Sequence, residues 1–182
     1  MERDAISANV SKGGLKNTTE IKIMVLYLLM NINEPLPASQ IANLLHLSGI
    51  ANTFEISDAF AQLSDSGLID EPEDFPDCFV INEKGRDAGQ TLQSRVPFTV
   101  REKSLTIARK MLERNRHIKE TDISISKNED GIYITCAALE GEKRVMSFSL
   151  QATDDEMAMR IKENFLDDPA LIYRTLIDLL TK

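Results

Sequence analysis

The sequence predicts an α+β protein, with helices in its first half and a small antiparallel sheet in its second. Apolar residues recur every three or four positions between residues 18 and 65, which is typical of helices that bury one face. Between residues 122 and 150 apolar and polar residues alternate, which is typical of strands. Two capping sequences, TDDE at 153–156 and DDP at 167–169, then predict two helices at the end of the chain.

The N-terminal elements follow from helix caps and turn residues. Thr18 or Thr19 can cap a first helix, which NEPLP ends. Asn52 stands three residues before Glu55 in a capping-box arrangement, and Gly67 ends the helix that begins there. Three helices and a hairpin are the smallest arrangement that buries all these apolar faces. The predicted elements are, in order, a flexible arm at 1–17, a helix from 18, a short helix after NEPLP, a third helix at 52–65, a hairpin at 68–81 and a helix capped by Asn82.

The second half begins with a long helical pattern at 99–116 and continues as a meander of three strands, DISISK, GIYITCAAL and RVMSFSL. Both faces of this sheet are partly apolar, so both need a cover. Helices are expected on one face and a second subunit, or alternatively a small ligand, on the other. We predict domains at 18–97 and 98–182, the second serving dimerisation or sensing. The middle strand places Ile132, Ile134, Cys136 and Ala138 on one face, and Tyr133, Thr135 and Leu139 on the other.

Charge separates the two predicted domains. The 182 residues carry a net charge of −8, and up to Pro97 there are 7 Lys and Arg against 14 Asp and Glu, whereas 14 stand against 15 afterwards. Such an acidic balance argues against a general polyanion binder. The hairpin connection contributes five acids and no Lys or Arg: Asp70, Glu71, Glu73, Asp74 and Asp77.

The stretch LSDSGLI, followed by FVINEKGR, resembles the winged-helix regulators of the PadR and MarR type. The match covers residues 18–95, and the whole chain resembles a bacterial family described as domain of unknown function 4364, with a winged-helix N-terminal half. The resemblance implies a helix-turn-helix with a β wing, DNA binding and a role in transcription regulation. The C-terminal part departs from PadR proteins, which usually finish in helices without a sheet.

In winged-helix proteins the third helix, here 52–65, would lie in the major groove with its first turns at the base edges. The resemblance implies DNA contacts from Asn52, Thr53, Ser57 and Gln62, on the same face as Asp58 and Ala61, and from Lys84 and Arg86 behind the wing. This helix face has no Lys or Arg, so phosphate attraction depends on Lys84 and Arg86, on Lys12 and Lys16 in the arm, and on Lys22. Alternatively, these cations are solvated surface charges.

The long helix carries a basic cluster. It could embrace DNA beside the N-terminal domain, or it could meet the acidic wing of a second subunit, in which case the wing never meets DNA. The alternative is the polar face of a dimer or linker helix. The cluster consists of Arg101, Lys103, Arg109, Lys110, Arg114 and Arg116.

No motif for catalysis or metal binding is present, so we expect no enzyme, metal or cofactor. His46 and His117 lack the spacing of a triad or a metal centre. Cys78 and Cys136 lie far apart without a CxxC motif, so both are expected to be structural thiols.

No apolar run reaches the roughly 20 residues of a membrane span, and the N-terminus lacks a secretory signal, so a cytoplasmic location is expected. The leading hypothesis is a homodimeric winged-helix transcriptional regulator that binds DNA. One rival is a winged-helix protein-interaction module without DNA binding, and another is a ligand-sensing module in the meander. The sequence identifies no small-molecule effector.

Overall fold

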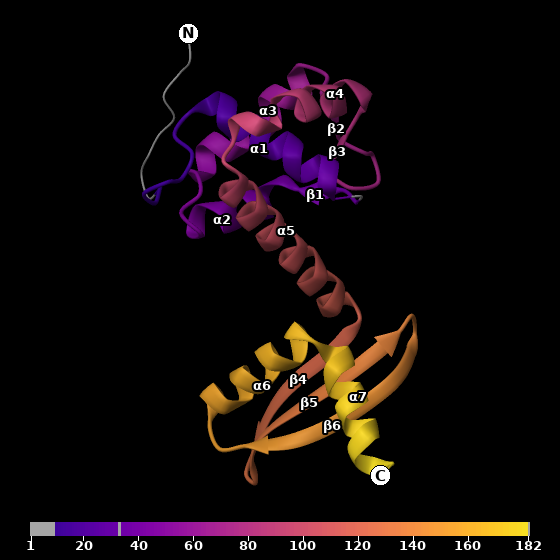
Figure 1. Ribbon diagram of the computed structural model, residues 1–182. Helices are drawn as coiled ribbons and strands as arrows, with labels where there is room; N and C mark the ends of the chain where they lie inside the picture. The colour runs from indigo at the N-terminus through magenta and orange to yellow at the C-terminus, as the bar shows by residue number, and fades with distance from the viewer. Residues whose placement is uncertain (1–9, 33, 182) are drawn as a thin grey trace. The chain divides into compact units, whose positions relative to one another are not determined.

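The computed structural model describes residues 10–32 and 34–181 (Figure 1). These residues form seven α-helices and two three-stranded antiparallel sheets, which confirms the predicted α+β class. The chain divides into two compact units, the first ending at Lys110 and the second comprising Met111–Lys182. The division falls within α5 (Phe98–Lys119), which the sequence predicts at 99–116. Each unit has buried apolar residues of its own.

The first unit follows the predicted order of three helices, a hairpin and a helix, and it adds one strand. This strand, β1, forms where the sequence predicts only a break. The Leu36 side chain is fully buried, and the Leu36 backbone pairs with Phe79 of the middle strand, β3. Pro37 is tolerated there because an edge strand needs fewer backbone donors. The bounds are α1 Thr18–Asn31, β1 Leu36–Pro37, α2 Ala38–Leu47, α3 Thr53–Asp65, β2 Ile69–Asp70, β3 Cys78–Ile81, α4 Glu83–Leu92 and the 3-10 turn η1 Gln93–Arg95.

Helix α1 forms the centre of this unit. Every residue from Ile23 to Leu29 is buried, because α3, α4 and β3 pack around the helix. A helix that is apolar on most sides is stable in water only when it is surrounded in this way. The cap is Asn17, whose Oδ1 accepts a hydrogen bond from Thr19 N at 2.8 Å, so α1 is capped one residue before the predicted Thr18.

The predicted flexible arm lies partly outside the described residues, which begin at residue 10. Its described part corrects the prediction, because it is fixed along the turn between α2 and α3. Ser11 N donates to Gly49 O at 2.9 Å, and Leu15 N donates to Ile50 O at 2.7 Å. The Leu15 side chain is 2% exposed, so its burial in the core accounts for this attachment.

The connection between β2 and β3, residues 71–77, folds back on the start of α2. Asp77 O accepts the N–H of Ala38 at 2.9 Å, and the Asp77 carboxylate accepts hydrogen bonds from the N–H and the hydroxyl of Ser39. Asp77 has a φ of 60°, a conformation that Asp tolerates better than most other residues. Glu71 Oε1 in turn accepts from Asp77 N at 2.7 Å, so acids of the connection hold it in a compact shape.

The second unit consists of the end of α5, the predicted meander and two helices. Both predicted helix starts are confirmed, but α6 is capped by Asp154 and not by Thr153 of the predicted capping box. Asp154 Oδ1 accepts from Met157 N at 2.7 Å, and Asp168 Oδ1 accepts from Leu171 N at 2.8 Å. Figure 1 shows α6 and α7 on the same side of the sheet. The bounds are β4 Thr121–Asn128, β5 Gly131–Glu140, β6 Lys143–Ala152, α6 Asp155–Asp167 and α7 Pro169–Leu180.

The two faces of this sheet differ in character. The face under the helices is apolar, and Ile134 and Cys136 pack there against Phe165 of α6. The opposite face carries hydroxyl groups across the strands, as in the row of Ser124, Thr135 and Ser149. It is therefore less apolar than the sequence predicts, because serines flank the middle strand on both sides.

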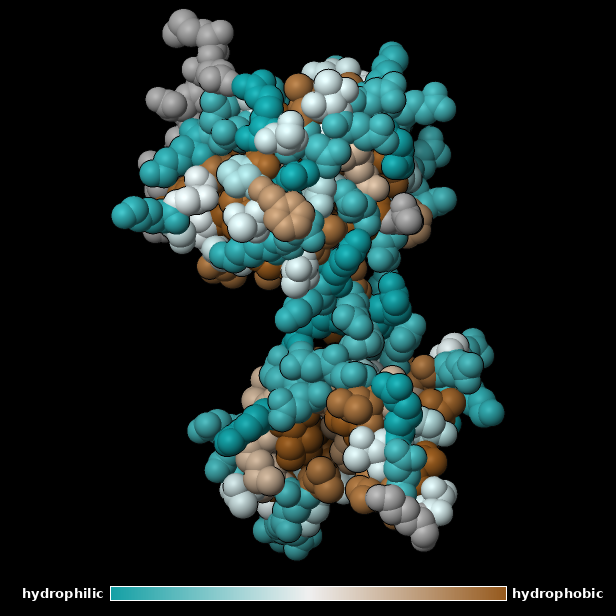
Figure 2. Space-filling view, viewed as in Figure 1, coloured by the Kyte–Doolittle hydropathy of each residue, from teal (hydrophilic) through white to brown (hydrophobic). Residues whose placement is uncertain are grey.

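The second unit also exposes many apolar side chains. Ten of the fourteen exposed large apolar residues in the described chain belong to it. Figure 2 shows brown side chains over the region where Figure 1 draws α6 and α7. An apolar surface of this kind usually marks an interaction site. Its members on the helices are Met159, Leu171, Tyr173, Ile177, Leu179 and Leu180.

Candidate nucleic-acid interface

Helix α3 turns one face into the first unit and the other to solvent. Ile56, Phe60 and Leu63 are buried, where α3 packs on α1 and α2. Their spacing of three and four residues leaves the opposite stripe outside. Of the residues predicted to contact DNA, Ser57 is exposed, whereas Thr53 and Gln62 are half-buried.

Asn52 does not belong to this outward surface. It is 6% exposed, and its Oδ1 accepts a hydrogen bond from Phe54 N at 2.9 Å, as an N-cap does. The prediction of a base contact from Asn52 is therefore corrected, because the side chain is buried and is used to start α3.

Gln62 is held by two neighbours. Its Oε1 accepts a hydrogen bond from Lys22 Nζ of α1 at 3.2 Å, and its Nε2 donates to Asp58 Oδ2 at 2.5 Å. Lys22 therefore brings a cation to the edge of a helix face that has none of its own. The same contacts fix the Gln62 amide and partly satisfy its hydrogen-bonding groups.

Three further lysines lie around the turn between α2 and α3. Lys103 Nζ of α5 donates to Ser48 O, just after α2, at 2.9 Å. Lys12 and Lys16 are exposed beside the backbone that pairs with Gly49 and Ile50. Residues from two separate parts of the sequence thus place positive charge at the turn that precedes α3.

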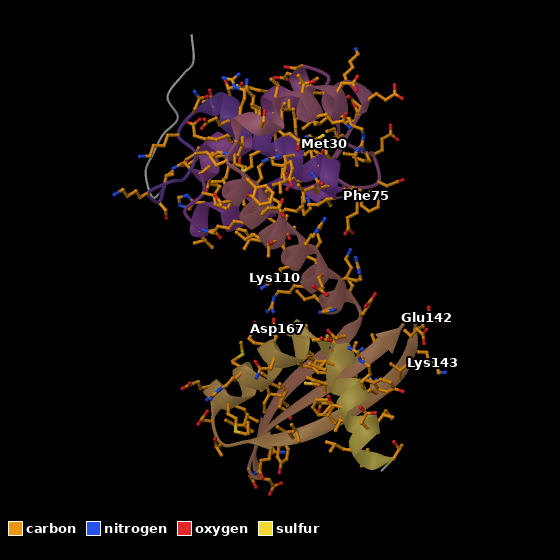
Figure 3. All side chains as sticks on the ribbon, viewed as in Figure 1. Met30, Phe75, Lys110, Glu142, Lys143 and Asp167 are labelled. Carbon is orange, nitrogen blue, oxygen red and sulfur yellow. The ribbon has the colours of Figure 1, made fainter. Side chains whose placement is uncertain are left out.

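The acids of the β2–β3 connection divide into two groups. Asp70, Glu71 and Asp77 make hydrogen bonds within the unit, Asp70 with the Asn82 amide at 3.3 Å. Glu73 and Asp74 are exposed near Phe75, which Figure 3 labels on this connection. Glu71 and Asp77 therefore shape the connection and the start of α2, and Asp70 contacts the residue that caps α4, which gives these three acids a structural role besides their charge.

Lys84 and Arg86 are exposed in the first turns of α4. Asn82 caps this helix as predicted, with Oδ1 accepting from Gly85 N at 3.0 Å. Gly85 is required because a Cβ at this position would lie 2.0 Å from Leu68 O. This close approach fixes α4, and the two cations with it, directly behind the β2–β3 hairpin.

The residues of the predicted basic cluster on α5 differ in what they contact. Arg101 lies 5.0 Å from the ring centre of Tyr27, and its Nη1 donates to Gln93 Oε1 at 2.9 Å. Arg114 pairs with Glu163 and, at 3.1 Å, with Asp167, which Figure 3 labels at the end of α6. Lys103, Arg109, Lys110 and Arg116 are exposed.

Tyr27 joins α1 to α5 through a second contact. Its hydroxyl donates to Glu102 Oε1 at 2.6 Å. This hydrogen bond, followed by burial, raises the pKa of Tyr27 above its usual value. Together with Arg101 over the ring, the contact anchors the start of α5 to the first unit.

Sequence reasoning missed the most exposed apolar residues of the interface. Phe54, the second residue of α3, is 76% exposed, and Leu47, the last residue of α2, is 81% exposed. The signal for Phe54 was present, because it precedes Asp58 by four residues and Ala61 by seven. Phe54, Asp58 and Ala61 therefore lie on one stripe of α3.

The described residues contain no group of three or more His, Cys, Asp and Glu side chains that could hold a metal ion. His46 is half-buried with Nδ1 unpartnered, and His117 Nδ1 lies 2.7 Å from Leu166 O. The second unit has a cavity of about 440 Å³ between charged and apolar side chains. Its lining includes Arg114, Asp122, Lys162, Glu163, Ile118 and Ile123.

Comparison with known proteins places the chain in a family. The profile of the family described as "Domain of unknown function (DUF4364)" matches residues 21–180, so the chain belongs to that family. No curated protein and no solved structure matches the chain. Within the described residues, no helix has the length and apolar character needed to cross a membrane.

Proposed function

We propose that this protein is a winged-helix transcriptional regulator that binds DNA through α3. The order α1, β1, α2, α3, β2, β3 supports a helix-turn-helix followed by a small wing. In such proteins the second helix of the motif enters the major groove. The outward face of α3 is available for this role, because only its opposite face is used in packing.

The observation that carries the proposal is the positive charge beside the α2–α3 turn: Lys103 Nζ binds Ser48 O, and the exposed Lys12 and Lys16 belong to the segment whose backbone pairs with Gly49 and Ile50. Phosphate contacts position a protein on the duplex, and cations at this turn would flank the groove that α3 enters. These lysines also supply positive charge that the acidic wing lacks. Phosphate attraction need not come from the wing, and three of its acids already make hydrogen bonds within the first unit.

The second unit would join two copies of the chain. Its exposed apolar side chains on α6 and α7 suit a homodimer, since most soluble oligomers are symmetric and pair like surfaces. Two copies would present two α3 helices to successive half-sites. The proposal assigns no catalytic step to either unit.

The test is the salt dependence of binding to a short fluorescent duplex of random sequence. Each phosphate contact contributes a slope of about −0.9 in log affinity against log salt. Replacing Lys12, Lys16 or Lys103 singly by Gln should therefore reduce the slope by about 0.9 per subunit contact. Lys143→Gln, at the exposed β5–β6 turn labelled in Figure 3, is the matched control. A wild-type protein that binds no duplex at about 0.05 M salt would refute the proposal.

A second candidate is a winged-helix module that binds another protein. Asp58 and Asp65 on the outer face of α3, with Glu73 and Asp74 in the wing, are exposed and favour a basic partner. Absence of duplex binding at low salt, for a protein that light scattering shows to be a dimer, would support this candidate instead.

A further inference from the structure

Phe54 is an aromatic side chain without a cover at the centre of the proposed reading surface. Its ring is 76% exposed, although the neighbouring Ile56 is fully buried. On the helical repeat it lies in line with Asp58 and Ala61, directly opposite the buried stripe. Exposing a large apolar group to water is unfavourable, so this position gains most from a partner with apolar surface.

The other side chains of this face do not suit the usual contacts to purines. Guanine is read mainly by Arg or Lys and adenine by Asn or Gln. The face has no Arg or Lys, Asn52 is buried as a cap, and Gln62 is held by Lys22 and Asp58. What remains for base edges is the Phe54 ring, the Thr53 and Ala61 methyl groups, the Ser57 hydroxyl and the exposed carboxylates of Asp58 and Asp65. In the major groove a carboxylate can accept from the amino group of cytosine but has no donor to meet on guanine.

The C5-methyl group of thymine is the one apolar feature that a base edge presents in the major groove, and Phe, Ala and the Thr methyl are its known contact partners. Thr53 and Phe54 begin α3, next to the turn where Lys12, Lys16 and Lys103 gather. Cations on the phosphates would hold this end of the helix against the bases. The cations therefore lie at the end of α3 that carries these apolar side chains, whereas the acids Asp58 and Asp65 lie further along the helix.

We infer that Phe54, supported by Thr53 and Ala61, recognises thymine methyl groups, so that the protein prefers duplexes in which several thymines line the major groove. This inference rests on the proposed DNA binding. It names the substrate class for the same surface: A·T-rich sites read through methyl groups, with little direct reading of guanine.

The experiment compares three fluorescent duplexes of equal length with the full-length protein at low salt. The first contains only A·T pairs, the second has deoxyuridine at every thymidine position, and the third contains only G·C pairs. Deoxyuridine removes the methyl group and keeps the hydrogen-bonding pattern. We expect the second duplex to bind more weakly by about fourfold for each methyl group that the protein buries. A fourth duplex, in which 5-methylcytosine restores methyl groups to the G·C sequence, should recover part of the affinity.

Two variants connect the effect to one residue. Phe54→Ala should abolish the difference between the thymidine and deoxyuridine duplexes. Phe98→Ala is the matched control, because Phe98 is also an aromatic residue with a largely exposed side chain but belongs to α5, and it should leave the difference unchanged. Circular dichroism should show both variants folded, since neither side chain is buried.

The outcomes separate the inference from the proposed function. Equal affinity of the wild type for the thymidine and deoxyuridine duplexes would overturn the inference and leave DNA binding in place. A difference that persists in Phe54→Ala would overturn the role of Phe54. Absence of binding to every duplex would overturn both, and would leave Phe54 as an apolar contact for a protein partner.

Discussion

Replacing Phe165 by Ala tests whether the two units fold as separate bodies. Phe165 of α6 is 1% exposed and lies edge-on to Phe148, with ring centres 5.6 Å apart and an interplanar angle of 84°. It also packs on Ile134 and Cys136 in the middle of the sheet. All described members of this cluster belong to the second unit, so the loss should fall on the second unit alone.

The magnitude follows from the size of the cavity and of the unit. Truncating a buried Phe to Ala costs about 3–5 kcal/mol, which includes an edge-to-face contact of about 0.5–1.5 kcal/mol. A unit of this length has roughly 4–11 kcal/mol of unfolding free energy in total. For so small a domain, each 1 kcal/mol moves the midpoint by about 4–8 °C, so a shift of at least about 12 °C is expected.

The assay is calorimetric unfolding of three proteins at one concentration. Phe60→Ala is the matched variant in the first unit, because Phe60 is also 1% exposed and packs on Phe79, with ring centres 5.4 Å apart. Phe165→Ala should lower one transition and Phe60→Ala the other. A single transition that both variants shift equally would refute the assignment of two cores. Phe165→Leu, which keeps most of the apolar volume, should give a smaller shift of the same transition.

Three further predictions concern single groups. An aromatic disulfide reagent for thiols should modify Cys78, which is half-buried. It should leave Cys136 unmodified until denaturant is added, because Cys136 is buried and its burial raises the pKa of the thiol. In an alkaline absorbance titration one of the three tyrosines, Tyr27, should ionise at a higher pH than the others. Glu102→Ala should bring the pKa of Tyr27 back toward its usual value, and an unchanged titration curve would contradict the Tyr27–Glu102 contact. The hydrogen bond from Met157 N lowers the pKa of Asp154. The stability that this bond adds is therefore present above the pKa of an unfolded Asp, about 4, and is lost as the pH falls through the lower pKa of the folded state. Asp154→Asn should reduce this acid sensitivity of the second unit.

The elements that local sequence determines could be predicted. The caps at Asn82 and Asp168, and the start of α6 to within one residue, could be predicted because a capping side chain and the N–H whose hydrogen bond it accepts lie within three residues of each other. The outward face of α3 follows from the spacing of Ile56 and Phe60. In both cases the information lies within one or two helical turns.

What could not be predicted depends on partners that are distant in the sequence. β1 forms because Leu36 meets Phe79, and no local pattern marks a two-residue strand. Arg101 and Arg114 look like free cations until Tyr27 and Glu163 are found beside them. Asn52 was recognised as a cap and yet also predicted to contact bases, although one buried side chain satisfies only the first role.

The contact between Lys103 and Ser48 O has a consequence for the proposed binding of DNA. A lysine ammonium has three N–H donors, and the carbonyl takes one of them, so two remain for an anion. The carbonyl also restricts the long side chain before any ligand arrives, which lowers the entropy lost on binding. In a complex with DNA, the Lys103 ammonium group would lie between Ser48 O and the phosphate, so it would set the distance between the phosphate and the protein backbone. Lys103 would then act as a spacer that sets how deeply the next helix enters the groove.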